Sequence, residues 1–196
     1  EANYEYRIPI ASRASDEFTL LGRAINISLT QLGERFSMLK FLPKHTLKMI
    51  AYANEQQSQV DLNMVRNIEC VIMETDIRGF TELTQSFSPR ETIRLINEYI
   101  EVQAEIIIMD AYNGSIDKYM GDAVLVIFEG DDKERRAYEC AHHVQHSLRQ
   151  LNKRNRRKAR KAGTSYQEVE IGIGLSMGRV IMGNMGCAER MEHTVI

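Results

Sequence analysis

Two aspartates, Asp76 and Asp122, are the residues of this sequence best suited to carry chemistry. Asp76 follows a short, mostly apolar run and precedes a turn containing Gly79, and Asp122 follows Gly121 between two segments that read as strands. A turn that enters a helix exposes backbone N–H groups and attracts anions. A carboxylate beside such a turn would repel phosphate unless a cation lay between them, so Asp76 indicates a hard metal ion, with Mg²⁺ the first choice.

The spacing of the two aspartates favours a shared site. In a β-α-β-β arrangement the ends of the first and second strands can be neighbours, so Asp76 and Asp122 could hold two divalent metals for phosphoryl displacement. The alternative is two unrelated aspartates in turns or at helix N-caps, where this residue is common.

The elements around these aspartates predict an α+β fold. Residues 69–75 are expected to form a buried strand. Ser88-Pro89 should begin a helix, because Pro suits its first position and Glu91 its first turn. Further strands are expected at 115–119, 123–128, 168–175 and 179–182, and a helix at 132–152. The order β-α-β-β-α-β predicts a ferredoxin-like core.

A long helix is expected before this core. Asp16 offers an N-cap, and an apolar seam follows in steps of three and four: Phe18, Leu21, Ile25, Leu29, Leu32, Phe36 and Leu39. The narrow heptad seam, with one extra step of four, favours a parallel dimeric coiled coil. An amphipathic helix that packs on its own domain is the alternative. Residues 41–67 read as a linker with a short helix around 44–53.

Composition excludes several classes of protein. The 196-residue chain is 43% hydrophobic with a formal charge of −2, has no apolar run long enough to span a membrane, and gives no overall attraction to nucleic acid. Three dispersed cysteines exclude a disulfide framework and indicate a reducing setting.

The basic run at 153–161 is interpreted as a solvated helix end. His142 and His146 have the spacing of a zinc pair but lack the accompanying Glu.

A first resemblance covers about the first 30 residues. Ile8-Pro9, Asp16-Glu17-Phe18, Leu21 and Ile25-Asn26 resemble the second half of a HAMP domain, with Thr19 in place of the family's Gly and the first HAMP helix absent. Residues 1–40 are therefore expected to be the C-terminal half of a HAMP domain with its coiled-coil helix.

A second resemblance is stronger and runs from Phe41 to Ile196. Three segments, TDIRGFTELTQSFSPRETIRLINEYI, NGSIDKYMGDAVLVIF and IGIGLSMGRVIMGNMG…RMEHTVI, resemble in order and spacing the motifs of class III nucleotidyl cyclases. The resemblance implies a catalytic domain at residues 68–196. It also implies conversion of a nucleoside triphosphate to its 3′,5′-cyclic monophosphate and pyrophosphate, in dimers that share their sites across the interface.

The resemblance assigns roles to residues of the first two segments. Asp76 and Asp122 would bridge two metal ions, Mg²⁺ or Mn²⁺, and Ile77 would lend a backbone carbonyl to one of them. The phosphate turn would consist of Gly79, Phe80 and Thr81.

The resemblance also assigns two purine-reading positions, Lys118 and Thr194. Lysine suits adenine because its ammonium can donate to ring N1, whereas guanylyl cyclases carry an acid there. Threonine at the second position is typical of a subclass whose members are often bicarbonate-responsive. Both readers would face the metal pair of the opposite protomer.

The sequence departs from the family pattern at three places. Glu74 stands where Phe is usual, and Leu175-Ser176-Met177 replaces the usual residues before Gly178. The chain, which begins at Glu1, stops at Ile196, before the motif that supplies an Asn and an Arg. Losing such charge-stabilising donors costs about 10²–10³-fold each, so this fragment is expected to be weakly active or inactive.

Together these observations predict a HAMP-regulated receptor adenylyl cyclase. The parent protein is expected to be a homodimer with a transmembrane sensor upstream and its catalytic part on the cytoplasmic side of the membrane. It would act on ATP and have no nucleic-acid partner. A guanylyl cyclase and a non-catalytic dimerising module are the alternatives; a diguanylate cyclase lacks support because its Gly-Gly-Asp/Glu-Glu-Phe motif is absent.

Overall fold

The computed structural model describes residues 5–10, 16–56, 65–85, 87–164, 166–187 and 189–196. The chain divides into two compact units, Glu1–Pro43 and Lys44–Ile196, each of which is described by itself. Among the described helices, none combines the length and apolarity that a membrane crossing requires.

The first unit contains helix α1 (Glu17–Leu39), which begins at the predicted cap, where Asp16 Oδ1 accepts the Thr19 N–H at 2.8 Å. Asn26 joins this helix to the preceding segment, because its amide accepts the Ile8 N–H at 2.8 Å and donates to the Ile8 carbonyl at 3.0 Å. The expected seam is largely exposed, with Phe18 at 83% and Leu21 at 58%. The coiled coil stays a prediction.

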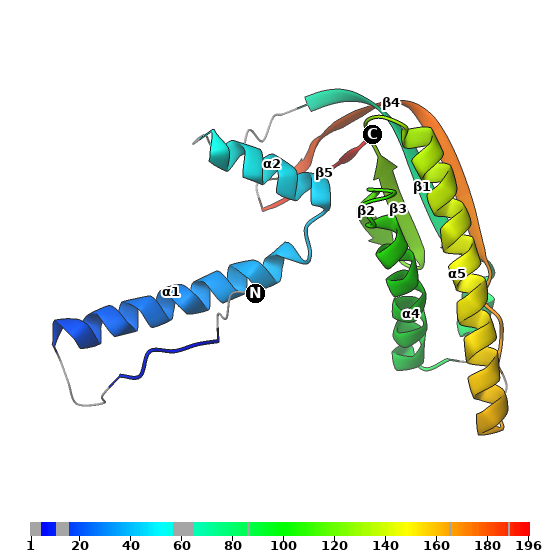
Figure 1. The fold of residues 1–196 in the computed structure, drawn as a ribbon, viewed down its shortest axis with the longest axis horizontal. Coiled ribbons are helices and arrows are strands. Elements are labelled where there is room, and N and C mark those ends of the chain that lie inside the picture. The colour runs from blue at the N-terminus through cyan, green and yellow to red at the C-terminus, as the bar shows by residue number, and fades with distance from the viewer. Residues whose placement is uncertain (1–4, 11–15, 57–64, 86, 165, 188) are drawn as a thin grey trace. The chain divides into compact units, whose positions relative to one another are not determined.

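The second unit is an antiparallel sheet with helices. Its strands are β1 (Val65–Ile77), β2 (Ser115–Met120), β3 (Ala123–Phe128), β4 (Ile171–Cys187) and β5 (Arg190–Val195), in the spatial order β2-β3-β1-β4-β5 (Figure 1). β1 pairs antiparallel with both β3 and β4. The first four strands therefore have the ferredoxin-like order that the sequence predicted, and β5 extends the sheet beside β4.

Helices α4 (Pro89–Ile107) and α5 (Lys133–Ala162) pack against each other and against the sheet (Figure 1). They bury a core that includes Met73, Tyr99, Ile107, Val124, Phe128 and Val144. A smaller cluster of Ile68, Cys70, Ile127 and Met182 forms separately. Met182 and Ile127 of this cluster line a pocket together with side chains of α2 (Lys44–Glu55).

Element boundaries follow local chemistry in some places and tertiary pairing in others. The α4 start is confirmed, because Ser88 and Glu91 form a reciprocal capping box and Pro89 opens the helix. By contrast, the two strands expected at 168–175 and 179–182 are a single strand, β4, because its residues 171–183 pair without a break with β1. Helix α5 extends past the expected 132–152 to Ala162, and it thereby includes the basic run 153–161, which confirms the interpretation of that run as a helix end.

Candidate functional site

Asp76 and Asp122 come together where β1 ends. Asp76 is the next-to-last residue of β1, and its side chain is exposed. Asp122 lies in the tight turn between β2 and β3, where Gly121 adopts a φ of +68° that favours glycine. Because β3 pairs with β1, the turn is carried to the strand end that bears Asp76.

The two carboxyl groups are close enough to perturb each other. Asp122 Oδ2 accepts the Ile77 N–H at 3.1 Å, and the Asp122 carboxyl is within hydrogen-bonding reach of Asp76. Burial, and then the neighbouring Asp76, raise the pKa of Asp122 above its ordinary value. Two like-charged groups held together in this way favour a cation between them.

This donor set fits a hard divalent cation whose remaining coordination positions are filled by the substrate. Within the described ranges, no cluster of three or more His, Cys, Asp or Glu side chains could hold a metal by itself. Mg²⁺ is commonly bound by one or two carboxylates, with phosphate oxygens and water supplying the rest. Asp76 and Asp122 match that protein share in number and chemistry, and their role as metal ligands, like the carbonyl role of Ile77, stays a prediction.

The glycine turn expected to hold phosphate follows Asp76 directly. Gly79 has a φ of +63° and begins the short helix α3 (Phe80–Thr84), and its carbonyl accepts the Leu83 N–H at 2.9 Å. Phe80 is half-buried against the main core, whereas Thr81 is exposed. The turn is thus anchored by one apolar side chain and presents its polar side outward.

The predicted purine readers lie on the two edge strands of the sheet. Lys118 is on β2 and Thr194 on β5, which are at opposite ends of the strand order. Side chains nevertheless join the two edges: Lys118 Nζ bonds to Glu192 of β5, and Thr194 Oγ1 donates to Asp117 Oδ2 of β2 at 2.7 Å. The sheet therefore brings its first and last strands into contact at this point.

Asp117 is a residue of this site that sequence reasoning missed. Its side chain is 1% exposed, and Lys118 Nζ lies 3.5 Å from its Oδ2. The pairing of β2 with β3 shifts register between Ile116 and Lys118, so that Asp117 is an extra residue of β2. The sequence signal that could have indicated Asp117 is an acidic residue next to Lys118 inside a segment that otherwise resembles a strand.

The charge of Lys118 is maintained by its neighbours. Burial works against its charged form, but the hydrogen bond to Glu192 and the charges of Asp117 and Glu192 outweigh burial and raise the pKa of Lys118. Lys118 is therefore a fixed donor rather than a group that gives up its proton.

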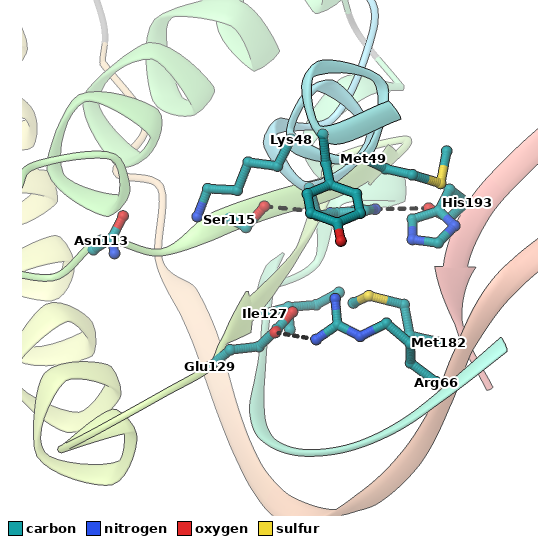
Figure 2. Close-up of a pocket in the computed structure, with 11 residues that line it drawn as sticks. Lys48, Met49, Arg66, Asn113, Ser115, Ile127, Glu129, Met182 and His193 are labelled. Carbon is teal, nitrogen blue, oxygen red and sulfur yellow. Dashed lines mark hydrogen bonds and ion pairs between the residues drawn. The ribbon is translucent and has the colours of Figure 1, made fainter. Parts of the chain in front are cut away.

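His45 of α2 completes this arrangement and was also missed. Its Nε2 lies 2.7 Å from the His193 carbonyl oxygen and 3.3 Å from Asp117 Oδ1, and its Nδ1 lies 3.3 Å from Ser115 Oγ. These contacts border a pocket of about 350 Å³ (Figure 2), in which Ser115 and His193 lie across from the Arg66–Glu129 ion pair. No local pattern could have linked His45 to strands so distant in sequence. We refer below to Asp117, Lys118, Glu192, Thr194 and His45 as the reader cluster.

Two other features of the sequence are resolved by the structure. Glu74, the departure from the family pattern, has an exposed side chain on the same face of β1 as Asp76. His142 and His146 lie on α5, and Tyr138 packs edge-on against His142 at 4.8 Å between ring centroids. As stated above for the described ranges, neither histidine belongs to a metal-binding cluster.

Comparison with known proteins places this geometry in a family. Residues 62–194 match the model of the adenylate and guanylate cyclase catalytic domain. An adenylate cyclase of Anabaena cylindrica is 31% identical over 202 residues, which cover 98% of this chain and 38% of that protein. The chain thus spans about two-fifths of the length of this relative.

Solved structures include both kinds of cyclase. A bacterial light-regulated adenylyl cyclase matches with a TM-score of 0.72 at 25% identity, over 94% of this chain and 50% of the other. The guanylyl cyclase Cya2 matches with a TM-score of 0.59 at 31% identity, over 69% and 66% of the two chains. With its βαββαβ core and paired aspartates, the chain belongs to the family of class III adenylyl and guanylyl cyclase catalytic domains.

Proposed function

We propose that this chain carries an adenylyl cyclase catalytic domain that converts ATP to 3′,5′-cyclic AMP and pyrophosphate. The observation that supports this most is the convergence of Asp76 and Asp122 beside the Gly79 turn. The fixed ammonium of Lys118 next to Thr194 supports adenine as the base.

Each group has a distinct part in the proposed reaction. Asp76 and Asp122 would hold two divalent cations, with Ile77 lending a carbonyl, and the cations when bound would draw charge off the triphosphate and the attacking 3′-oxygen. The turn formed by Gly79, Phe80 and Thr81 would position the phosphates. Lys118 would donate to adenine N1, and Thr194 would read the exocyclic group.

A dimer would complete the site, with the readers of one protomer facing the metal pair of the other. The exposed apolar side chains of β4 support this partner: Leu175, Met177, Ile181 and Met185 are 41–57% exposed. Apolar patches of this kind commonly mark protein interfaces.

The direct test is cyclic AMP formation by the full-length protein with Mg²⁺ or Mn²⁺, comparing Asp76→Asn with Asp131→Asn. Asp131 is an exposed carboxylate outside the proposed site, so its substitution controls for charge. We expect the Asp76 variant to lose activity and the Asp131 variant to keep it. Full activity of Asp76→Asn would contradict the proposal.

A guanylyl cyclase is the second candidate, because the Cya2 structure is a close match. The ratio of kcat/KM for ATP to that for GTP decides between the two. A preference for GTP would overturn the adenine assignment while leaving the cyclase reaction in place. If neither nucleotide is cyclised although both bind, the domain is a non-catalytic module.

Regulation through the first unit is proposed on two features of α1. The two hydrogen bonds between the Asn26 amide and the backbone of Ile8 hold the segment before the helix against α1, in keeping with the HAMP resemblance. The exposed apolar seam of α1 is suited to pack against a partner helix. In the parent protein this unit would relay a signal from a transmembrane sensor to a catalytic part on the cytoplasmic side.

A cysteine crosslink tests this relay. Leu32 is 43% exposed on the seam, so Leu32→Cys should crosslink to its counterpart in a dimer. The exposed native Cys187 must first be replaced by Ser. We expect the crosslinking yield to differ between signalling states, and equal yields would count against the relay.

A further inference from the structure

Asp117 occupies a buried position between the two proposed purine readers. Its carboxylate accepts the Thr194 hydroxyl at 2.7 Å and lies 3.5 Å from Lys118 Nζ. Its side chain is 1% exposed and that of Thr194 is also buried, at 2% for the whole residue. The carboxylate therefore fixes both readers from inside the sheet, out of contact with bulk water.

This contact sets the hydrogen-bonding polarity of the readers. A hydroxyl has one proton, and Thr194 donates its proton to Asp117, which leaves only lone pairs for a ligand. Lys118 has protons but no acceptor. The pair thus presents one donor and one acceptor that cannot exchange roles while Thr194 donates to Asp117.

The fixed polarity matches one purine and opposes the other. Adenine carries an amino donor at position 6 and guanine an oxygen acceptor; ring N1 accepts in adenine and bears a proton in guanine. Thr194 as acceptor and Lys118 as donor therefore complement adenine at both atoms. Against guanine, Thr194 would place lone pair against lone pair and Lys118 would place donor against donor.

We propose that Asp117 is a positioning residue that determines the specificity of the site. By holding Thr194 as an acceptor, Asp117 makes the site selective for a 6-aminopurine nucleotide. The inference rests on the proposed function in taking Lys118 and Thr194 as the base readers. Asp117 acts through these readers and does not itself contact the substrate.

His45 of α2 holds Asp117 in this role. Both neighbours of His45 Nε2, the His193 carbonyl oxygen and Asp117 Oδ1, are acceptors, so Nε2 carries the proton. Apart from this ion-pair contact at 3.3 Å, Asp117 Oδ1 is buried with no hydrogen-bond partner among the described residues. A buried carboxylate is costly unless it is compensated, so His45 stabilises the form of Asp117 that orients Thr194.

The test is the nucleotide selectivity of Asp117→Asn in the full-length protein, measured as kcat/KM for ATP, GTP and purine riboside triphosphate, which lacks the 6-amino group. Asparagine has one acceptor oxygen for the three donors that surround Asp117. We expect the ATP-to-GTP ratio to fall about tenfold, the value of one hydrogen bond. The preference of the wild type for ATP over purine riboside triphosphate should fall similarly.

Three further variants separate this role from a merely structural one. Thr194→Val removes the acceptor, so Asp117→Asn should cause no further loss of selectivity in that background. His45→Phe should raise KM for ATP and lower selectivity, and His45→Gln should restore part of it, because its amide can still donate to Asp117. Asp110→Asn, on an exposed turn, is the matched control.

The outcomes distinguish this inference from the proposed function. If Asp117→Asn and His45→Phe fold but lower the rates with all three nucleotides equally, the inference is wrong while the cyclase assignment stands. If Asp117→Asn does not fold, the variants His45→Phe, His45→Gln and Thr194→Val test the inference in its place. Unchanged nucleotide selectivity in all three overturns the inference. Activity that survives Asp76→Asn would instead overturn the proposed function.

Discussion

Asp122 and Asp117 lie on the same β-hairpin, and each carboxyl group is at least partly removed from water. Asp122 meets another carboxyl group, Asp76, and its pKa is raised by burial and by that neighbour. Asp117 instead meets a hydroxyl, an ammonium and an imidazole from Thr194, Lys118 and His45. Among the residues that the structure describes, the first carboxylate has no ion-pair partner, whereas the second is surrounded by donors.

The difference separates two requirements of the proposed reaction. In the proposed reaction the Asp76–Asp122 pair would be completed by a cation, which would bring metal and triphosphate together. The reader cluster instead holds opposite charges and hydrogen-bond partners from the chain itself, so its polarity exists before the nucleotide arrives. Groups that are oriented in advance do not need to reorganise when the substrate binds.

The largest effect is expected from breaking the carboxylate pair. Asp122→Asn keeps an acceptor for the Ile77 N–H but halves the charge offered to the cations. We expect kcat for cyclic AMP formation to fall by about 10²–10³-fold or more, measured by chromatography of the product at saturating Mn²⁺. A loss below tenfold would mean that Asp122 is not a metal ligand.

The next effect concerns the charge of Lys118. Lys118→Met removes the donor and should lower kcat/KM for ATP about 10- to 100-fold, as for other hydrogen bonds to charged groups. Lys118→Glu should move preference toward GTP, but the structure adds a cost, because the new acid would face Asp117 and Glu192. An unchanged ATP-to-GTP ratio in a folded Lys118→Glu protein would weaken the purine assignment.

A smaller and opposite effect is expected for stability without metal. Asp122→Asn relieves the repulsion with Asp76, so we expect its Tm in chelator to exceed that of the wild type by about 2–4 °C, or ~1 kcal/mol for a domain of this size. Mn²⁺ should then raise the Tm of the wild type more than that of the variant. Differential scanning fluorimetry measures both, and equal metal responses would separate Asp122 from metal binding.

An effect on stability of similar size concerns His193, whose carbonyl oxygen accepts from His45. Burial, and then the neighbouring His45, lower the pKa of His193 below its ordinary value of about 6.5. The unfolded chain therefore binds a proton at a higher pH than the folded chain, and stability must fall as the pH drops below about 6.5. We expect Tm to fall by about 2–4 °C more, between pH 7.5 and pH 5.5, in the wild type than in His193→Gln.

Much of the fold could be predicted because it depends on local chemistry. The Ser88-Pro89-Glu91 cap and the apolar run 123–128 gave element positions that the structure confirms. The length of β4 could not be predicted, since Gly178 in the gap between the two expected strands resembles a strand break and the pairing with β1 keeps the strand continuous there. The expected helix range 132–152 was short of the end of α5, but the charged composition of 153–161 correctly indicated a helix end there.

The candidate site divides in the same way. Asp76 and Asp122 stood out because each lies at the end of an expected strand and adjoins a glycine turn. Asp117 and His45 did not stand out, because their significance lies in contacts between β2, β5 and α2. Such contacts depend on how the sheet brings its edges together, which a single sequence does not display.

The extra residue that Asp117 adds to β2 bears on how base selectivity could be transferred between cyclases. Because the register shifts between Ile116 and Lys118, the acid is buried while the adjacent lysine remains partly exposed. Exchanging the lysine alone into a hairpin without this irregularity would leave it with no internal acid to orient it. To transfer base selectivity to another cyclase, one would therefore have to exchange the whole irregular strand β2 together with Thr194 of β5.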